Sequence, residues 1–256
     1  MLVKIRGKNI KYQKINSEFE DISGTVMVFL HDGLGSIKQW KDIPQQLSES
    51  LKIPALVYER HGFGESEIIE SHYERDIFKK EAYIRLPSLL DKVKFTNKII
   101  LVGLSDGATI ALLYASEFPD KVASVVSIAG HVINEEETIA GVRKGKIAYD
   151  SGELKKALQK YHGLKTDFVF KRWFEIWTSK EFKDLDIIDR LKLIKSPVCV
   201  IQGDRDEYGT EKQVEIIKNN VAGKAETHII KDSGHFPHIE KREEVMGIIT
   251  KFIKDN

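Results

Sequence analysis

Residues 99–117 place a serine where it could act as a nucleophile. The segment reads IILVGLSDGATIALLYASE, so Ser105 stands between Gly103 and Gly107. An apolar run precedes this turn and apolar residues at helical spacing follow it, which predicts a buried strand, a tight turn and a helix. At such a turn the serine backbone is strained, and neighbours without side chains leave room for its hydroxyl. A nucleophilic serine is therefore the first functional hypothesis.

The helix predicted after Ser105 contributes a second chemical element. Its first N–H groups lack partners within the helix, and the helix dipole is positive at that end. These groups point to the place where an oxyanion would form during attack on an acyl carbon. Because a serine hydroxyl needs a base to remove its proton, the rest of the chain must supply a histidine and a carboxylate.

Strand-like and helical patterns alternate along most of the chain. Mostly apolar runs, typical of strands inside a parallel sheet, span residues 25–30, 54–58, 99–102 and 122–129. A helix is predicted through Trp40, Ile43 and Leu47, and the alternation of strands and helices returns from residue 198 onward. This alternation implies crossover connections, a mostly parallel sheet and helices on both of its faces.

No strand-like run is found between residues 131 and 194, where the pattern is helical. Within this interval, the apolar residues of 169–177 cover a wider arc than one packing face requires. Two interpretations stay open: two interfaces bury this helix, or its second apolar face lines a substrate pocket beneath a lid. The second interpretation predicts Phe170, Trp173 and Trp177 as pocket residues.

Length and charge restrict the class of protein. The 256 residues suit one large α/β domain with an insertion, and 40 Lys and Arg against 39 Asp and Glu leave no broad basic surface for nucleic acid. A single cysteine, Cys199, excludes a disulfide within the chain. No apolar run approaches the length of a membrane span, so we expect a cytoplasmic protein without membrane or nucleic-acid partners. Its oligomeric state stays open.

Loops at the carboxyl ends of the predicted strands carry a set of motifs, and open α/β sheets place their sites there. The motifs are His31-Asp32-Gly33-Leu34-Gly35, Arg60-His61-Gly62-Phe63-Gly64-Glu65-Ser66, the Ser105 turn, Gly203-Asp204-Arg205-Asp206 and Ser233-Gly234-His235. In this order they resemble the α/β-hydrolase superfamily, in the branch with a helical cap, over essentially the whole chain. The chain order Ser, Asp, His is also that of the family.

The resemblance implies a fold and a division of the chain. The expected sheet is eight-stranded, mostly parallel and flanked by helices, with a small helical cap between its sixth and seventh strands. Residues 1–130 and 195–256 would form the α/β-hydrolase core domain, and residues 131–194 the cap.

The resemblance also implies the catalytic residues. Ser105 would be the nucleophile, and His235 its base and later the acid for the leaving group. Asp206, three residues after Gly203, would accept the other N–H of the histidine and hold its tautomer. The neighbouring carboxylate, Asp204, is interpreted as ordering the loop.

The family's oxyanion hole corresponds here to two backbone N–H groups. One belongs to Asp106, and the other to Gly33, with Leu34 as the alternative. Asp32 stands where many relatives have glycine, and we expect its side chain to point away from the hole and order the loop. The side chain of Asp106 is interpreted as an acidic residue favoured by the helix dipole rather than as a catalytic group.

Histidines could also indicate a metal. His31, His238 and the His235-x-x-His238 spacing are of this kind, but no cysteine or acidic partner set accompanies them. We therefore expect neither a metal nor a cofactor.

The predicted function is a cofactor-independent serine hydrolase that cleaves an ester, lactone or related acyl compound through an acyl-enzyme. The aromatic helix favours a small apolar or aryl acyl substrate, and a serine at the turn argues against dehalogenase and epoxide hydrolase chemistry. A C–C bond hydrolase or a peptidase on the same triad stays open, the peptidase with Glu135, Glu136 or Glu137 as candidates to hold a substrate amine. The other alternative is a weakly catalytic small-molecule receptor on the same scaffold.

Overall fold

A computed structural model describes residues 1–68, 71, 74, 76–95 and 98–256. In this part of the chain eight strands form one sheet in the order β1-β2-β4-β3-β5-β6-β7-β8. Their bounds are β1 Leu2–Ile5, β2 Lys8–Ile15, β3 Thr25–Leu30, β4 Ala55–Tyr58, β5 Lys98–Leu104, β6 Val122–Ile128, β7 Val198–Gly203 and β8 Ala225–Ile230. β2 pairs antiparallel with β1 and β4, and every other pairing is parallel, as the sequence predicted.

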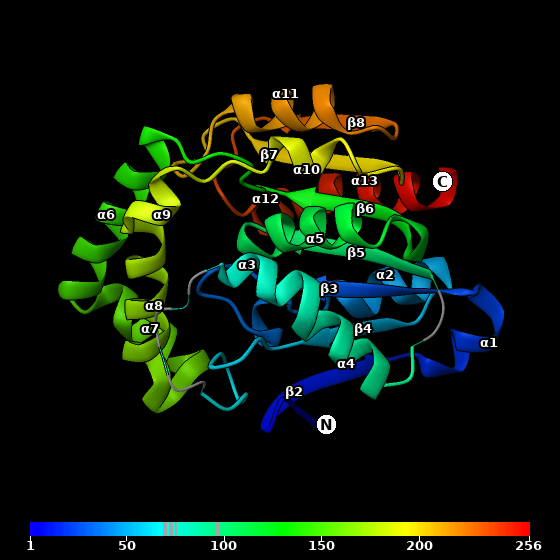
Figure 1. Cartoon of the computed structure of the whole chain (residues 1–256), viewed down its shortest axis with the longest axis horizontal. Helices are drawn as coiled ribbons and strands as arrows, with labels where there is room; N and C mark the ends of the chain where they lie inside the picture. Colours follow the sequence, from blue (N-terminus) through cyan, green and yellow to red (C-terminus); the bar gives the residue numbers. More distant parts are fainter. Residues whose placement is uncertain (69–70, 72–73, 75, 96–97) are drawn as a thin grey trace.

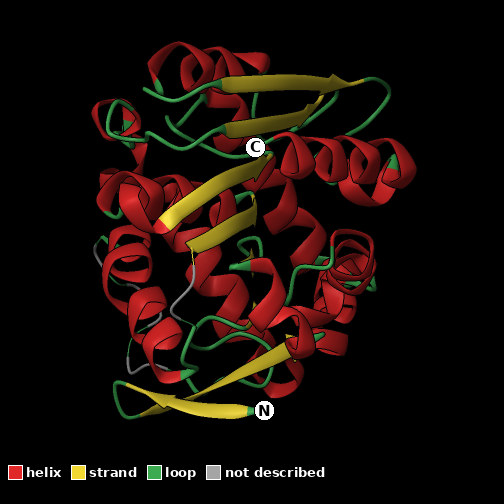
Figure 2. Ribbon diagram, turned by 90° about the vertical axis from the view of Figure 1, so that its right-hand side faces the viewer, coloured by secondary structure: helices red, strands yellow, loops and turns green. Residues whose placement is uncertain are grey.

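Helices cover both faces of this sheet, and Figure 2 shows the strands through the middle of the molecule with helices on either side. One face carries α3 Ile77–Lys80, the π-helical stretch η3 Glu81–Arg85, α4 Leu86–Lys92, α5 Asp106–Glu117, α10 Ile188–Leu191 and α11 Glu211–Asn220. The other carries η2 Ile37–Trp40, α2 Ile43–Leu51, α12 Pro237–Glu240 and α13 Arg242–Asp255. Three short pieces, η1 Ser17–Phe19, α1 Glu20–Ser23 and η4 Pro119–Lys121, complete the connections.

The apolar runs of the sequence become strands that are buried on both faces. In β3, Val26 and Val28 pack into one hydrophobic cluster, while Met27 and Phe29 pack into the other. Successive side chains of a strand point to opposite faces, so a strand covered on both sides is mostly apolar along its whole length. The two clusters hold the strand ends, and therefore the loops that follow them, in fixed positions.

The prediction of one continuous helix through Trp40, Ile43 and Leu47 is wrong. The chain forms η2 up to Trp40 and α2 from Ile43, and between them Lys41 has a φ of 52°. An α-helix cannot continue through a left-handed residue. Pro44 then stands in the first turn of α2, where its missing N–H has no helical partner to lose.

Between β6 and β7 the chain is helical, as expected. It forms α6 Glu136–Asp150, α7 Glu153–His162, η5 Gly163–Lys165, α8 Thr166–Thr178 and α9 Lys180–Lys183. Figure 1 shows α6, α7, α8 and α9 gathered at one end of the sheet, apart from the helices on its faces. We call these helices the cap helices. The division into a core of residues 1–130 and 195–256 and a cap of residues 131–194 stays a prediction.

Candidate active site

Ser105 lies at a strained turn between β5 and α5. Its backbone has φ 54° and ψ −117°, a conformation that side chains other than glycine rarely adopt. The backbone packs so closely here that a Cβ on Gly107 would lie 2.0 Å from the carbonyl oxygen of Leu30, and one on Gly103 would lie 2.4 Å from the carbonyl oxygen of Gly107. Both glycines are therefore required by space, and the predicted strand, turn and helix are present.

His235 and Asp206 come together from loops at the ends of β8 and β7. The Nδ1 atom of His235 lies 2.9 and 2.8 Å from the two carboxylate oxygens of Asp206. The backbone N–H of Tyr208 and the side-chain amide of Gln202 also donate to this carboxylate, at 2.8 and 2.6 Å, and hold it in place. Since the carboxylate accepts at Nδ1, that nitrogen carries the proton, and Nε2 is left as the basic nitrogen.

Charge around His235 favours its protonated form. Burial acts to lower the pKa of His235, but the Asp206 carboxylate and its hydrogen bond, assisted by Asp32 and Glu207, outweigh burial and raise this pKa. For Asp206 the opposite holds: burial acts to raise its pKa, while His235 and the Tyr208 N–H lower it. The pair is thus suited to stabilise the imidazolium that forms when a histidine accepts a serine proton.

Asp204 takes no part in this pair. Its carboxylate accepts from the backbone N–H of Ser233 at 3.3 Å and lies 3.5 Å from the ammonium of Lys231. It therefore orders the loop, as the sequence suggested.

Ser105 and His235 line the same cavity, which has a volume of about 50 Å³. Of the three predicted pocket residues, Trp173 and Trp177 also line this cavity. Phe170 does not, and instead stacks on Tyr149 with ring centroids 3.6 Å apart. No hydrogen bond joins the two described residues Ser105 and His235 here, and such contacts often align only when substrate binds.

Two backbone donors at this cavity are unoccupied. Among the described residues, the N–H groups of Gly33 and Asp106 have no acceptor. The N–H of Leu34 instead donates to Oδ1 of Asp32 at 3.0 Å. The structure therefore favours Gly33 over Leu34 as the donor that accompanies Asp106.

Asp32 orders the loop as expected, but it does not point away from the site. Its side chain is buried and lines the cavity with Ser105. Burial, with the nearby Asp106 carboxylate, raises the pKa of Asp32 to about 6, although His235 and Arg60 act against this shift. A carboxylate with this pKa is still mostly ionised at pH 7, so its charge supports the protonated form of His235.

The side chain of Asp106 makes specific contacts in addition to its favourable interaction with the helix dipole. It is buried, and its Oδ1 atom accepts from the indole N–H of Trp177 in α8 at 3.1 Å. Its Oδ2 atom lies 3.6 Å from a guanidinium nitrogen of Arg60. Asp106 therefore links the nucleophile turn both to the cap helices and to the loop after β4.

Arg60 is a functional candidate that the sequence motif contained but to which we assigned no role. Its guanidinium donates to the carbonyl of Asp32 and, at 3.3 Å, to that of His31. His31 accepts the backbone N–H of Arg60 at Nε2, so its Nδ1–H donates to the same Asp32 carbonyl, at 2.8 Å. That carbonyl shares a trans peptide with the N–H of Gly33, and the two groups point in opposite directions. Arg60 and His31 thus fix the direction of the Gly33 donor.

The histidines suggested as metal ligands are packed separately. His31 is committed to the loop contacts described above, and burial lowers the pKa of His238 to about 3. Within the described ranges, no group of three or more His, Cys, Asp or Glu side chains could hold a metal ion. None of the described helices combines the length and the apolar character needed to cross a bilayer.

Comparisons with known proteins agree with this architecture. Residues 25–149 match the family model described as alpha/beta hydrolase fold. The chain is 23% identical to serine hydrolase BPHL of Mus musculus over 262 residues, covering 98% of this chain and 85% of that protein. It is 21% identical to proline iminopeptidase of Lactobacillus crispatus (strain ST1) over 269 residues, covering 90% of each.

Solved structures show the same arrangement. The enol-lactonase of Burkholderia xenovorans LB400 superposes with a TM-score of 0.75 at 16% sequence identity, over 99% of this chain and 100% of that one. The relatives named here are hydrolases by their names. Together with the strand order and the nucleophile turn, these matches show that the chain has the α/β-hydrolase fold.

Proposed function

We propose that the protein is a cofactor-independent serine hydrolase that cleaves an ester, lactone or related acyl compound. One observation carries this proposal: a serine at a strained strand-to-helix turn shares a cavity with a histidine whose Nδ1–H is held by a carboxylate. This is the arrangement that nucleophilic acyl transfer requires.

The reaction follows from the positions of these groups. Nε2 of His235 accepts the proton of Ser105 as the hydroxyl oxygen bonds to the acyl carbon, and the N–H groups of Gly33 and Asp106 stabilise the resulting oxyanion. His235 then gives the proton to the leaving group, whose bond to the acyl carbon breaks and leaves an acyl-enzyme. Water, deprotonated by His235, attacks this ester and releases the acid and Ser105. Throughout, Asp206 holds the histidine tautomer.

Peptidase chemistry has weaker support, because none of the carboxylates suggested to hold a substrate amine lines the Ser105 cavity. Glu135 accepts from the N–H and hydroxyl of Thr210 and from Gln213, while Glu136 and Glu137 are exposed in the first turn of α6. None of the three lines the Ser105 cavity. A C–C bond hydrolase would use the same triad and is separated from an esterase by its substrates alone.

The test is labelling with a fluorophosphonate probe, measured by intact mass, together with turnover of p-nitrophenyl esters. We expect one adduct per chain, lost in Ser105→Ala and kept in Ser151→Ala, a control at an exposed serine. Ester turnover should be lost with the adduct. A folded protein that takes up no probe would overturn the hydrolase proposal and favour the receptor alternative.

A further inference from the structure

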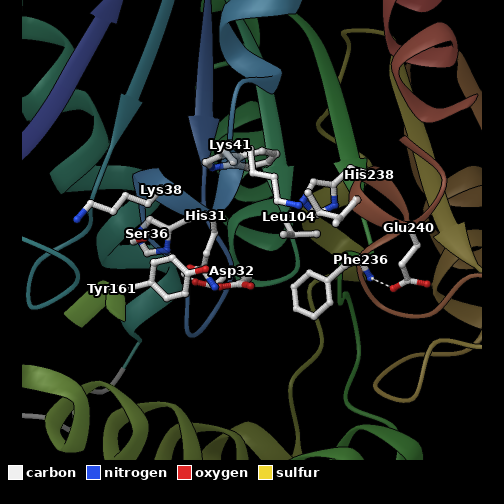
Figure 3. A pocket seen from close by; sticks show the side chains of 14 residues that line it. His31, Asp32, Ser36, Lys38, Lys41, Leu104, Tyr161, Phe236, His238 and Glu240 are labelled. Carbon is white, nitrogen blue, oxygen red and sulfur yellow. Dashed lines mark hydrogen bonds between the residues drawn. The ribbon is translucent and has the colours of Figure 1, made fainter. Parts of the chain in front are cut away.

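A second pocket, with a volume of about 390 Å³, lies next to the Ser105 cavity. Asp32 and Phe236 line both spaces, so the larger pocket and the Ser105 cavity are adjacent. The larger pocket is formed by the loop after β3, by η2 and α12, and by Tyr161 of α7. Figure 3 shows its principal side chains.

The two spaces differ in what they can hold. Small-molecule sites usually have volumes of about 300–1,000 Å³, a range that includes the larger pocket but not the Ser105 cavity. The Ser105 cavity has room for a few non-hydrogen atoms, on the order of an acetyl group. Most of a substrate must therefore lie outside it.

The positions of the reacting groups decide which part of a substrate lies in each space. An acyl carbon attacked by Ser105 must stay near Gly33, and both residues line the small cavity. The leaving atom must reach His235, because this residue would supply its proton. Phe236, the next residue in the chain, lines both spaces, so of the two spaces beside His235 the larger pocket is the one with room for a leaving group.

Buried polar atoms of the larger pocket lack partners. Among the described residues, no hydrogen bond is made by the hydroxyl of Ser36, the indole N–H of Trp40 or Nδ1 of His238, and all three side chains are at least 98% buried. A buried polar group without a partner costs about 1–3 kcal/mol. These three atoms are as inaccessible from the pocket as from solvent, so a ligand in the pocket does not bond to them without a shift of its wall.

The wall of this pocket carries the ammonium groups of Lys38 and Lys41 and the carboxylates of Asp32 and Glu240. Figure 3 shows the side chain of Lys41 extending toward His238, and Lys41 contributes to the lowered pKa of that histidine. No carboxylate of the described residues pairs with Lys41. Both carboxylates accept backbone hydrogen bonds: Glu240 from Gly234 and Phe236, and Asp32 from Leu34. The lining also includes apolar side chains such as Leu104 and Ile239.

Resting on the proposed hydrolase function, we propose that the larger pocket binds the leaving group of the substrate. This group has an apolar, ring-sized body and ends in a carboxylate or a comparable anionic oxygen group that faces Lys41. The acyl group is short, about the size of acetyl.

The test compares 4-acetoxybenzoate with its uncharged analogue, 4-acetoxybenzamide. We expect kcat/KM to favour the carboxylate by about tenfold, mainly through KM, as a charge-assisted contact predicts. Lys41→Gln should abolish this preference. Lys38→Gln is the matched control, because Lys38 borders the same pocket but its amine points away in Figure 3, and it should keep the preference.

Acyl chain length tests the assignment of the two spaces. Phenyl acetate should be cleaved faster than phenyl butyrate and phenyl octanoate, because the Ser105 cavity is small. Faster cleavage of the longer esters would place the acyl group in the larger pocket and overturn the proposal, as would equal kcat/KM for the carboxylate and the amide.

Two further readouts separate this proposal from the hydrolase proposal. Fluorophosphonate labelling in the same samples reports on Ser105 alone, so labelled enzyme without the carboxylate preference would refute only the leaving-group site. Calorimetric titration of Ser105→Ala with 4-hydroxybenzoate reports on the pocket alone. We expect binding that Lys41→Gln weakens and Lys38→Gln does not, and failure of 4-hydroxybenzoate to bind would refute the site.

Discussion

At the scale of single residues, the proposed chemistry depends on the charges beside His235. This residue must be neutral to accept the serine proton, yet Asp206 and Asp32 overcome the effect of burial and favour its protonated form. The same carboxylates that stabilise the imidazolium during the reaction therefore keep the resting base protonated to a higher pH than an isolated histidine.

The pH dependence of kcat/KM should reflect this balance. We expect activity to fall with decreasing pH through a pKa above about 6.5, the ordinary histidine value, because His235 is the essential base and its pKa is raised. Asp206→Asn should lower kcat by roughly 10³–10⁴-fold and move this limb to lower pH. Asp204→Asn should change neither quantity, and a larger loss from Asp204→Asn than from Asp206→Asn would reassign the acid.

Arg60 should act as a positioning residue for the Gly33 donor. We expect Arg60→Met to lower kcat by roughly 10–100-fold with little change in KM, because the donor is used more in the transition state than in substrate binding. Affinity for a boronic acid, which mimics the tetrahedral intermediate, should fall in parallel. Both kcat and the affinity for the boronic acid are measured per active site, counted by fluorophosphonate labelling.

A matched control for this variant is Arg172→Met. Arg172 is also buried, but it donates to the carbonyl of His61 at 2.7 Å and does not bond to the Asp32 carbonyl. The Arg172→Met variant should have a lower free energy of unfolding than the parent protein and the same kcat per active site. If both arginine variants reduce kcat equally, the effect is one of burial and not of donor orientation.

At the scale of elements, the nucleophile turn depends on how closely α5 approaches the end of β3. Space for a side chain is absent at Gly107, where the carbonyl of Leu30 passes within 2.0 Å of the Cβ position. This contact places the start of α5, and thus the N–H of Asp106, next to the loop that carries Gly33.

Gly107→Ala should therefore reduce the free energy of unfolding by about 3 kcal/mol or more, because α5 must move away from β3. Gly247→Ala is the matched control: this glycine is exposed within α13 and has nothing within 4 Å of its Cβ position. It should raise the free energy of unfolding by about 0.5–1 kcal/mol. Urea denaturation measures both, and equal stability of the two variants would contradict the close approach seen at Gly107.

At the scale of the whole molecule, buried polar contacts fasten the cap helices over the site. Trp177 donates to Asp106, and His162 accepts the N–H of Gly64 at Nδ1 while its Nε2–H donates to the carbonyl of Leu34. These bonds join α7 and α8 to three different loops of the core. The Trp177 contact holds α8 against the nucleophile turn, beside the Ser105 cavity.

Trp177→Phe tests this attachment. The ring would still pack, but Oδ1 of Asp106 would lose its donor, and we expect a loss of about 1–3 kcal/mol in the free energy of unfolding. Amide hydrogen exchange should increase in α8 and stay unchanged in β5. Trp173→Phe removes an indole from the same helix without breaking a hydrogen bond of the described residues, so it should leave exchange in α8 close to that of the parent protein.

The order of strands and helices and the strained turn could be anticipated from local patterns in the sequence, whereas the pairing of Asp206 with His235, 29 positions apart, was anticipated from the family resemblance alone. Apolar runs, close-packed glycines and the order of motifs are properties of neighbouring residues, and local sterics and burial act on them directly. Only the tertiary structure favoured Gly33 over Leu34, gave Arg60 a role and placed Phe170 away from the cavity. It also placed the larger pocket beside Trp40. These features depend on contacts between residues far apart in the chain, such as Asp106 and Trp177, 71 positions apart, whose meeting is decided by packing rather than by local pattern.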